Sequence, residues 1–224
     1  MYFLKTDVVN DDNNEIIPQV TGMGPVYDFD APDSLTRITP NAPLAHPPNL
    51  HAFQLDPETM LTDVVSQGYV FTNGLLISEA LTQVLDGRVI QRHELYPADV
   101  VFRGETYRYF WIHFTEELEE RIDYAHSEFV VEPLDGGPGR PIELRSRAEL
   151  HARVVELVDT MSGELKARRI AFLPRVPPLE LFSVQLTKRT FFASDELADR
   201  LEAEGLTGFE LQRAAVEILF STDR

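Results

Sequence analysis

Residues 74–87 read GLLISEALTQVLDG, and this stretch decides the fold class. The first four residues are small or apolar and predict a short buried strand. Ser78 follows as a helix N-cap, because its hydroxyl can accept hydrogen bonds from the first-turn amides. Leu81 and Leu85 recur at helical spacing, and Gly87 can adopt the left-handed conformation that ends a helix. The stretch therefore predicts a strand that runs directly into a short helix.

The same pattern returns near the C-terminus, where residues 189–211 read RTFFASDELADRLEAEGLTGFEL. Ser194 takes the N-cap position, acidic residues occupy the first turn, and Gly205 follows the helix as its stop. The two units cover about residues 74–95 and 190–213, and each predicts strand, helix and strand. Two interpretations remain open: an internal repeat, or a common form that any short unit of this kind takes. Either one concerns the fold rather than chemistry.

Two further segments carry strong signals. Residues 107–114 read YRYFWIHF, which predicts an aromatic strand buried on both faces. Ser146 and Glu149 have the spacing of a capping box, and Glu149 can pair with Arg153 one turn later. We expect that helix to end at Gly163. Its apolar stripe consists of Leu150, Val154, Leu157, Val158 and Met161.

The first part of the chain differs in kind. Eight of the fifteen prolines precede residue 60, which argues against a long helix there because proline lacks a backbone donor. We expect a strand near residues 2–9 and then an extended, acidic segment packed on the core, with the boundary at residues 68 and 69. Residues 69–224 would form the main domain, in which residues 136–139 make a turn. The predicted fold class is α+β, with a mixed, mostly antiparallel sheet, a few short helices and a proline-rich extended N-terminal region.

Composition excludes several classes of protein. The 224 residues contain 20 basic and 37 acidic side chains, a formal net charge of -17, and no cysteine. Without cysteine there are no disulfides, thiolate metal sites or cysteine nucleophiles. Nucleic acid and anionic membranes attract basic surfaces, so we expect neither as a partner. The N-terminus does not resemble a signal peptide, and no stretch reaches the roughly 18 apolar residues of a membrane helix, so we expect a cytoplasmic protein.

Most of the negative charge precedes residue 151. Residues 1–70 hold ten acidic and two basic side chains, whereas residues 151–224 hold twelve and ten. The densest cluster is EELEERID at residues 116–123, which can be a solvated face or a surface that attracts a basic partner. We take the second interpretation as the candidate partner-binding site. It consists of Glu116, Glu117, Glu119, Glu120 and Asp123.

No catalytic motif stands out. His126 and Glu128 have the spacing found in zinc deaminases, but those sites also need thiolates. The six histidines are scattered singly, and the chain lacks a zincin helix, a nucleophile elbow and a phosphate loop. We therefore predict no catalytic, cofactor-binding or metal-binding residues, and no enzyme activity.

The C-terminal unit resembles a known family. Residues 189–201, followed by GLTGFEL at residues 205–211, are similar to the closing signature of the Imm11 family of bacterial polymorphic-toxin immunity proteins, formerly a domain of unknown function. Residues 76–78, 107–113 and 123–129 also look like features of that family. The likeness touches about residues 70–135 and 170–215 and hardly reaches the first 60.

The resemblance implies a non-enzymatic protein that binds and neutralises a cognate secreted toxin inside the cell that produces it. Occlusion would be steric, helped by acidic side chains that face a basic toxin surface. Two alternatives stay open at this point: a carboxylate-dependent, possibly metal-assisted hydrolase, and a scaffold protein of a larger assembly. Neither the toxin nor the oligomeric state follows from the sequence.

Overall fold

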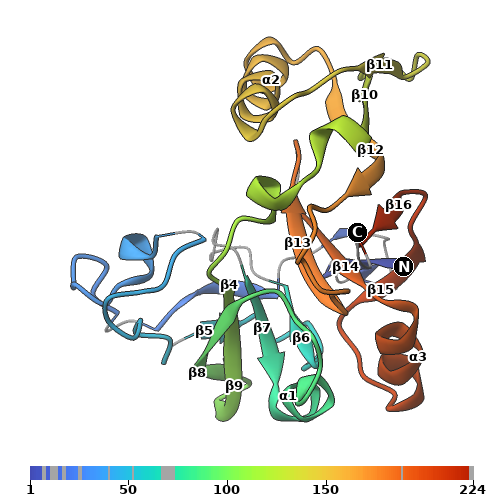
Figure 1. The fold of residues 1–224 in the computed structure, drawn as a ribbon. Coiled ribbons are helices and arrows are strands. Elements are labelled where there is room, and N and C mark those ends of the chain that lie inside the picture. Colours follow the sequence, from blue (N-terminus) through green and yellow to red (C-terminus); the bar gives the residue numbers. More distant parts are fainter. Residues whose placement is uncertain are drawn as a thin grey trace.

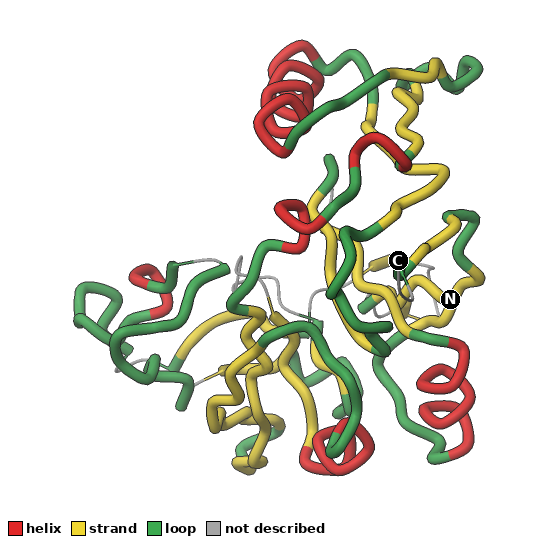
Figure 2. Tube along the Cα trace, viewed as in Figure 1, coloured by secondary structure: helices red, strands yellow, loops and turns green. Residues whose placement is uncertain are grey.

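The computed structural model describes residues 1–6, 9–10, 15–16, 19–24, 27–39, 41–51, 53–66, 74–187 and 189–221. Strands dominate the regular structure, and most neighbouring strands are antiparallel (Figures 1 and 2). The predicted α+β class is confirmed. The helices are α1 (Glu79–Leu85), α2 (Arg147–Thr160) and α3 (Asp195–Ala203), with 3-10 turns η1 (Leu35–Arg37), η2 (Leu118–Arg121) and η3 (Tyr124–His126).

A six-stranded sheet occupies the middle of the chain and has the order β4-β5-β8-β9-β7-β6. All its neighbours are antiparallel except the pair β5 and β8. The long β8–β9 hairpin turns at Arg103 and Gly104, which both have positive φ angles, as a type I′ turn requires. The strands are β4 (Val20–Met23), β5 (Phe53–Leu55), β6 (Val64–Val65), β7 (Gly74–Ser78), β8 (His93–Phe102) and β9 (Glu105–Phe114).

The second sheet brings the two ends of the chain together. Its order is β13-β14-β1-β15, so the N-terminal strand lies between two strands from the last part of the chain. Phe3 is opposite Phe192 on one side and Gln212 on the other. The strands are β1 (Tyr2–Lys5), β13 (Leu181–Gln185), β14 (Arg189–Ala193) and β15 (Glu210–Arg213). A separate small hairpin joins β2 (Val9–Asn10) to β3 (Glu15–Ile16).

The third sheet carries α2 and projects from the rest of the molecule (Figure 1). Its order is β11-β10-β12-β16, and α2 contacts β12. Only the last pair is parallel, and it covers Arg169–Ala171 of β12 alone. The strands are β10 (Glu128–Glu132), β11 (Arg140–Ile142), β12 (Glu164–Ala171) and β16 (Glu217–Leu219).

The two similar sequence units have the same topology. In the first, β7 and β8 both run antiparallel to β9, which lies between them. In the second, β14 and β15 both run antiparallel to β1, which again lies between them. Each unit also has an outer antiparallel neighbour, β6 or β13. The structure therefore shows two split strand–helix–strand units, and α1 and α3 lie in contact.

Both predicted serine caps are present. Ser78 Oγ accepts from the amide of Leu81 at 3.2 Å, and Ser194 Oγ accepts from the amide of Leu197 at 3.0 Å. Gly87 and Gly205 both have positive φ angles, as expected of the glycine stops. Local sequence therefore sets the form of each unit, since every one of these contacts joins near neighbours.

Asp63 joins the two units. Its carboxylate accepts from the Ser78 hydroxyl at 2.7 Å and from the backbone amide of Thr207 at 2.9 Å. The next residue, Gly208, has φ +90° and lies against the backbone of β6, where an added Cβ would meet Thr62 Oγ1 at 2.6 Å. The closing loop of the second unit therefore docks on the edge of the first sheet, and only glycine fits at position 208.

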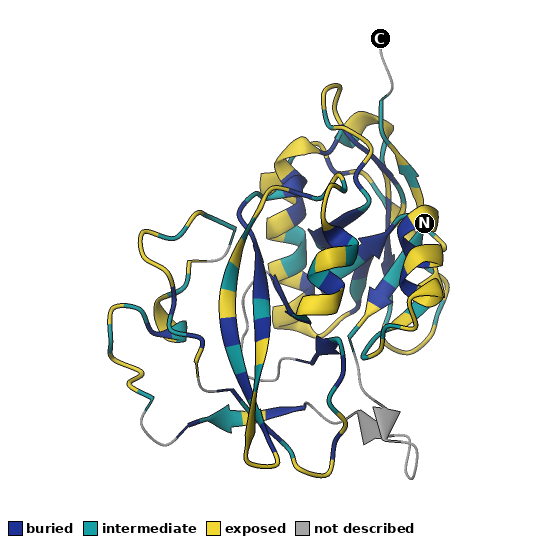
Figure 3. Ribbon diagram, turned by 90° about the horizontal axis from the view of Figure 1, so that it is seen from below, coloured by how far each residue is buried: buried dark blue, intermediate teal, exposed yellow. Residues whose placement is uncertain are grey.

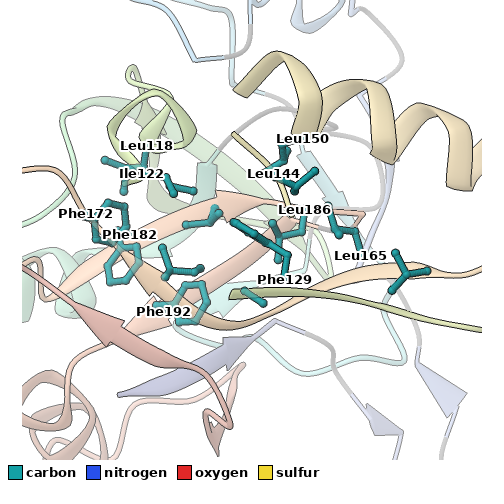
Figure 4. Packing of buried hydrophobic residues seen from close by; sticks show 14 of the residues in the cluster. Leu118, Ile122, Phe129, Leu144, Leu150, Leu165, Phe172, Phe182, Leu186 and Phe192 are labelled. Atoms are coloured by element: carbon teal, nitrogen blue, oxygen red, sulfur yellow. The ribbon is translucent and has the colours of Figure 1, made fainter. Parts of the chain in front are cut away.

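Three groups of buried apolar side chains hold these layers together. Figure 3 marks the buried residues along the ribbon. One joins the two equivalent units and contains Leu81 and Leu197. Another covers the opposite face of the six-stranded sheet around Trp111. The largest lies between the second sheet and the β10–β12 layer, where Phe182 and Phe192 stack at 5.0 Å (Figure 4). Apolar burial is the main favourable term in folding, so these three contacts fix the arrangement of the sheets.

Other predictions need qualification. The aromatic strand is buried on both faces from Trp111 to Phe114, but Arg108 is exposed. Among the described residues of the proline-rich region before position 60, the 3-10 turn η1 is the only helical element, and the absence of a long helix there agrees with the prediction. The predicted domain boundary at residues 68 and 69 lies outside the described residues. No helix in the described ranges is long and apolar enough to cross a membrane.

The sequence prediction for α2 was wrong in detail. The helix ends at Met161, which takes the left-handed cap with φ 48°, and not at Gly163. Gly163 is instead required by close packing, because an added Cβ would lie 2.6 Å from the carbonyl oxygen of Glu132. Ser146 caps the Glu149 amide at 3.2 Å as predicted, but the Glu149 carboxylate accepts from the amide of Arg145 at 2.8 Å. Arg153 pairs with Glu156 at 2.6 Å.

Candidate functional site

The predicted acidic segment follows β9 and crosses between α2 and β13. Its central residue, Glu119, is only 6% exposed and accepts a hydrogen bond from the backbone amide of Gln185 in β13. Gln91, at 1% exposure, accepts from the amide of Ser183 two residues earlier at 2.7 Å. Two buried side chains thus accept hydrogen bonds from the backbone amides on the outer edge of β13, where another strand would otherwise pair.

Burial controls the protonation of this region. Loss of solvent raises the pKa of the Glu119 carboxyl above its ordinary value, and the Gln185 amide and the nearby Arg189 oppose that rise. Burial also lowers the pKa of the Arg189 guanidinium, which Glu119 partly offsets. Arg189 donates to Ser183 Oγ at 3.3 Å. Glu119 therefore belongs to an internal polar network and does not form part of a surface.

The other four predicted residues are engaged in ion pairs within the chain. Glu117 pairs with Arg147 of α2 and accepts from Asn41 Nδ2 at 3.1 Å. Glu120 lies 3.7 Å from the same arginine. The remaining two pairs join Glu116 to Arg121 at 3.1 Å and Asp123 to His126 at 2.8 Å.

The two Arg147 ion pairs connect the acidic segment to α2, and the Asn41 hydrogen bond connects it to the proline-rich loop. The five predicted residues are near neighbours in the sequence, but the structure does not gather them on one free face. Partner binding by this segment remains a prediction.

The outward face of α2 is a feature that the sequence prediction missed. Val158 and Met161 belong to the predicted core stripe, but they are 54% and 77% exposed. Val155 is 43% exposed. Only Leu150 and Leu157 of that stripe are fully buried. We call Val155, Val158 and Met161 the α2 apolar face.

Acidic side chains border the α2 apolar face. Asp159 is exposed and lies one helical turn after Val155. Glu156 pairs with Arg153 beside them. An apolar centre with a charged rim is the usual anatomy of a protein interface, because solvent leaves the centre when the partner binds.

A cleft of about 890 Å³ lies beside β12. One wall consists of β10 and β12, whose exposed Lys166 and Arg168 line it. The opposite wall comes from β1 and β14 and includes Phe3 and Lys5. Leu165 and Ala167, which alternate with the two cations along β12, are buried in the core that β12 shares with α2. Leu165 and Ala167 also line the cleft, so the strand contributes both to the hydrophobic core and to a cleft with exposed cations.

Two histidines, His113 and His126, have hydrogen-bond partners within the fold. His113 is fully buried, stacks on Trp111 at 4.5 Å, and its Nε2 lies 2.9 Å from the carbonyl oxygen of Ala42. His126 bonds with Asp123 in the next turn. Among the described residues, no group of three or more histidine, aspartate and glutamate side chains converges as metal ligands would.

Comparison with known proteins gives no assignment. No protein-family model matches the chain, and no curated protein matches it.

Proposed function

We propose that this chain is a non-enzymatic binding protein of the immunity type, which covers and neutralises a cognate protein toxin. The observation that carries the proposal is the α2 apolar face. A helix with Val155, Val158 and Met161 in water exposes side chains that a soluble fold normally buries. A partner that covers this face recovers the free energy of burying them.

The rim indicates the chemistry of the partner. Asp159 borders the apolar centre, and the chain as a whole carries a charge of -17. Complementary charge accelerates encounter and selects the partner, so the partner surface should combine an apolar centre with lysine or arginine around it. The resemblance of residues 189–211 to immunity proteins supports a toxin as that partner.

The test uses the toxin domain encoded beside this chain, expressed with and without it in a bacterial growth assay, and purified for binding measurements. Val155→Asp and Val158→Asp should each weaken binding by about tenfold or more, because each removes a buried valine from the interface. Val89→Asp is the matched control, since Val89 is 44% exposed in a different part of the fold. Full rescue and unchanged affinity in the α2 variants would refute this placement of the interface.

A second variant tests the predicted acidic segment separately. The Glu120 side chain is 63% exposed and only loosely paired with Arg147. If this segment also faces a basic toxin surface, Glu120→Lys should slow association and weaken its dependence on salt. Unchanged association kinetics would remove the segment from the interface and leave the α2 apolar face as the proposed contact.

A further inference from the structure

The cleft beside β12 has the dimensions of a site for one extended chain. Its lining follows β12 from Glu164 to Ile170, a run of about 20 Å at the rise of a strand. The cleft therefore follows the strand over a length that an extended segment of about six residues would cover.

The edge of β12 is open where the cleft follows it. β16 pairs only with Arg169–Ala171, so Lys166–Arg168 have β10 on one side and no described strand on the other. At Leu165 this edge is already occupied, because the Leu165 amide donates to the hydroxyl of Thr187 at 2.6 Å, and Thr187 lines the cleft. An added segment in line with β16 would continue the sheet there, as in other cases of strand addition.

The lining of the cleft is positively charged, whereas the chain as a whole is negatively charged. Among the described residues, four cations line it against two carboxylates, Glu132 and Glu164, in a protein of net charge -17. Lys166 lies 2.5 Å from Glu132. In the described part of the chain, no carboxylate lies within ion-pair distance of Lys5 or Arg168, and both are exposed. Their free cations fit acidic side chains on an incoming segment. The lining cations are Lys5, Lys166, Arg168 and Arg189.

We propose that this cleft binds an extended, acidic polypeptide segment as an added strand beside Lys166–Arg168 of β12. Carboxylates of the segment pair with Lys5 and Arg168, while its apolar side chains pack on Phe3 and Val130. This site is distinct from the α2 apolar face, because none of the described residues that line the cleft belongs to α2. The inference does not depend on the identity of the toxin.

Fluorescence anisotropy with synthetic peptides tests the site. The probe is a labelled octapeptide of alternating valine and glutamate, and it should bind the full chain at low ionic strength. The matching peptide of valine and lysine should not bind. Lys5→Glu together with Arg168→Glu should weaken binding of the acidic peptide by roughly tenfold or more. The control variant Arg92→Glu reverses one positive charge outside the cleft, and it should leave the affinity for the acidic peptide almost unchanged.

Two further arms separate strand addition from simple charge attraction. A peptide that carries N-methyl groups on alternate backbone amides keeps its charge but cannot pair along the strand edge, so it should lose affinity. Citrate at the same charge concentration should not displace the probe. Equal binding of the methylated peptide, displacement by citrate, or unchanged affinity of the cleft variant would each overturn the proposal. Backbone amide shifts at Lys166–Arg168 in the unmodified protein report the same site without relying on variants.

Discussion

Ser78 and Ser194 begin equivalent helices, yet the structure predicts that they contribute differently to stability. Both hydroxyls accept from the third amide of their helix. Ser78 also donates to Asp63 at 2.7 Å and so ties its helix to the junction between the units. We therefore expect Ser78→Ala to be more destabilising than Ser194→Ala.

The magnitudes follow from these contacts. Loss of a serine N-cap costs about 1 kcal/mol, which is the whole expected effect at Ser194. A hydrogen bond to a charged group adds about 1.5–3 kcal/mol. The low end applies at Ser78, because Thr207 still donates to Asp63 from its amide and its hydroxyl. Ser78→Ala should therefore lower the free energy of unfolding by about 2–3 kcal/mol.

Urea unfolding followed by circular dichroism measures both effects, with equal slopes as the check that the unfolded states match. A double-mutant cycle with Asp63→Asn isolates the junction. We expect a coupling energy of about 1 kcal/mol for Ser78 and none for Ser194, whose contacts are remote from Asp63. Equal destabilisation by the two serine variants, or additive behaviour of Ser78 with Asp63, would refute the role assigned to the junction.

Three further predictions concern the fold. Gly208→Ala should destabilise the protein by at least about 3 kcal/mol, because the strain of the left-handed conformation adds to a steric clash with β6. The control variant Gly87→Ala should cost only about 1 kcal/mol, because Gly87 has φ +73° but open space around it. Equal urea midpoints for the two variants would contradict this prediction. Burial raises the folded-state pKa of the Glu119 carboxyl, so its contribution to stability falls as pH rises from the ordinary pKa of a glutamate to the raised one. Glu119→Gln cannot ionise, so its stability relative to the wild type should increase as pH rises above the ordinary pKa of a glutamate, and a decrease in urea unfolding would contradict this. Deletion of residues 1–6 removes the central strand of the second sheet and should abolish cooperative thermal unfolding, and a retained sharp transition would show that β1 is dispensable.

The functional surfaces were harder to predict than the secondary structure. Residues 116–123 look like a free acidic patch in the sequence, because nothing local reveals that Arg147 and β13 will approach them. Val158 and Met161 fit the apolar period of α2, but the β10–β12 layer is too narrow to cover the whole stripe. The cleft could not be predicted either, since Lys5 and Arg168 are far apart in the chain. A sequence signal for it does exist in the alternation of apolar and basic residues along residues 165–168.

The sequence by itself determined the α+β class, the serine caps, the positive-φ glycines after α1 and α3, and the similarity of the two units. Each of these depends on hydrogen bonds or periodicity within a few residues. Only the tertiary structure decided that β1 completes the second unit, that Glu119 caps the edge of β13, and that one face of α2 stays in water. Those outcomes depend on which distant surfaces pack together, and burial assigns different roles to side chains of the same kind.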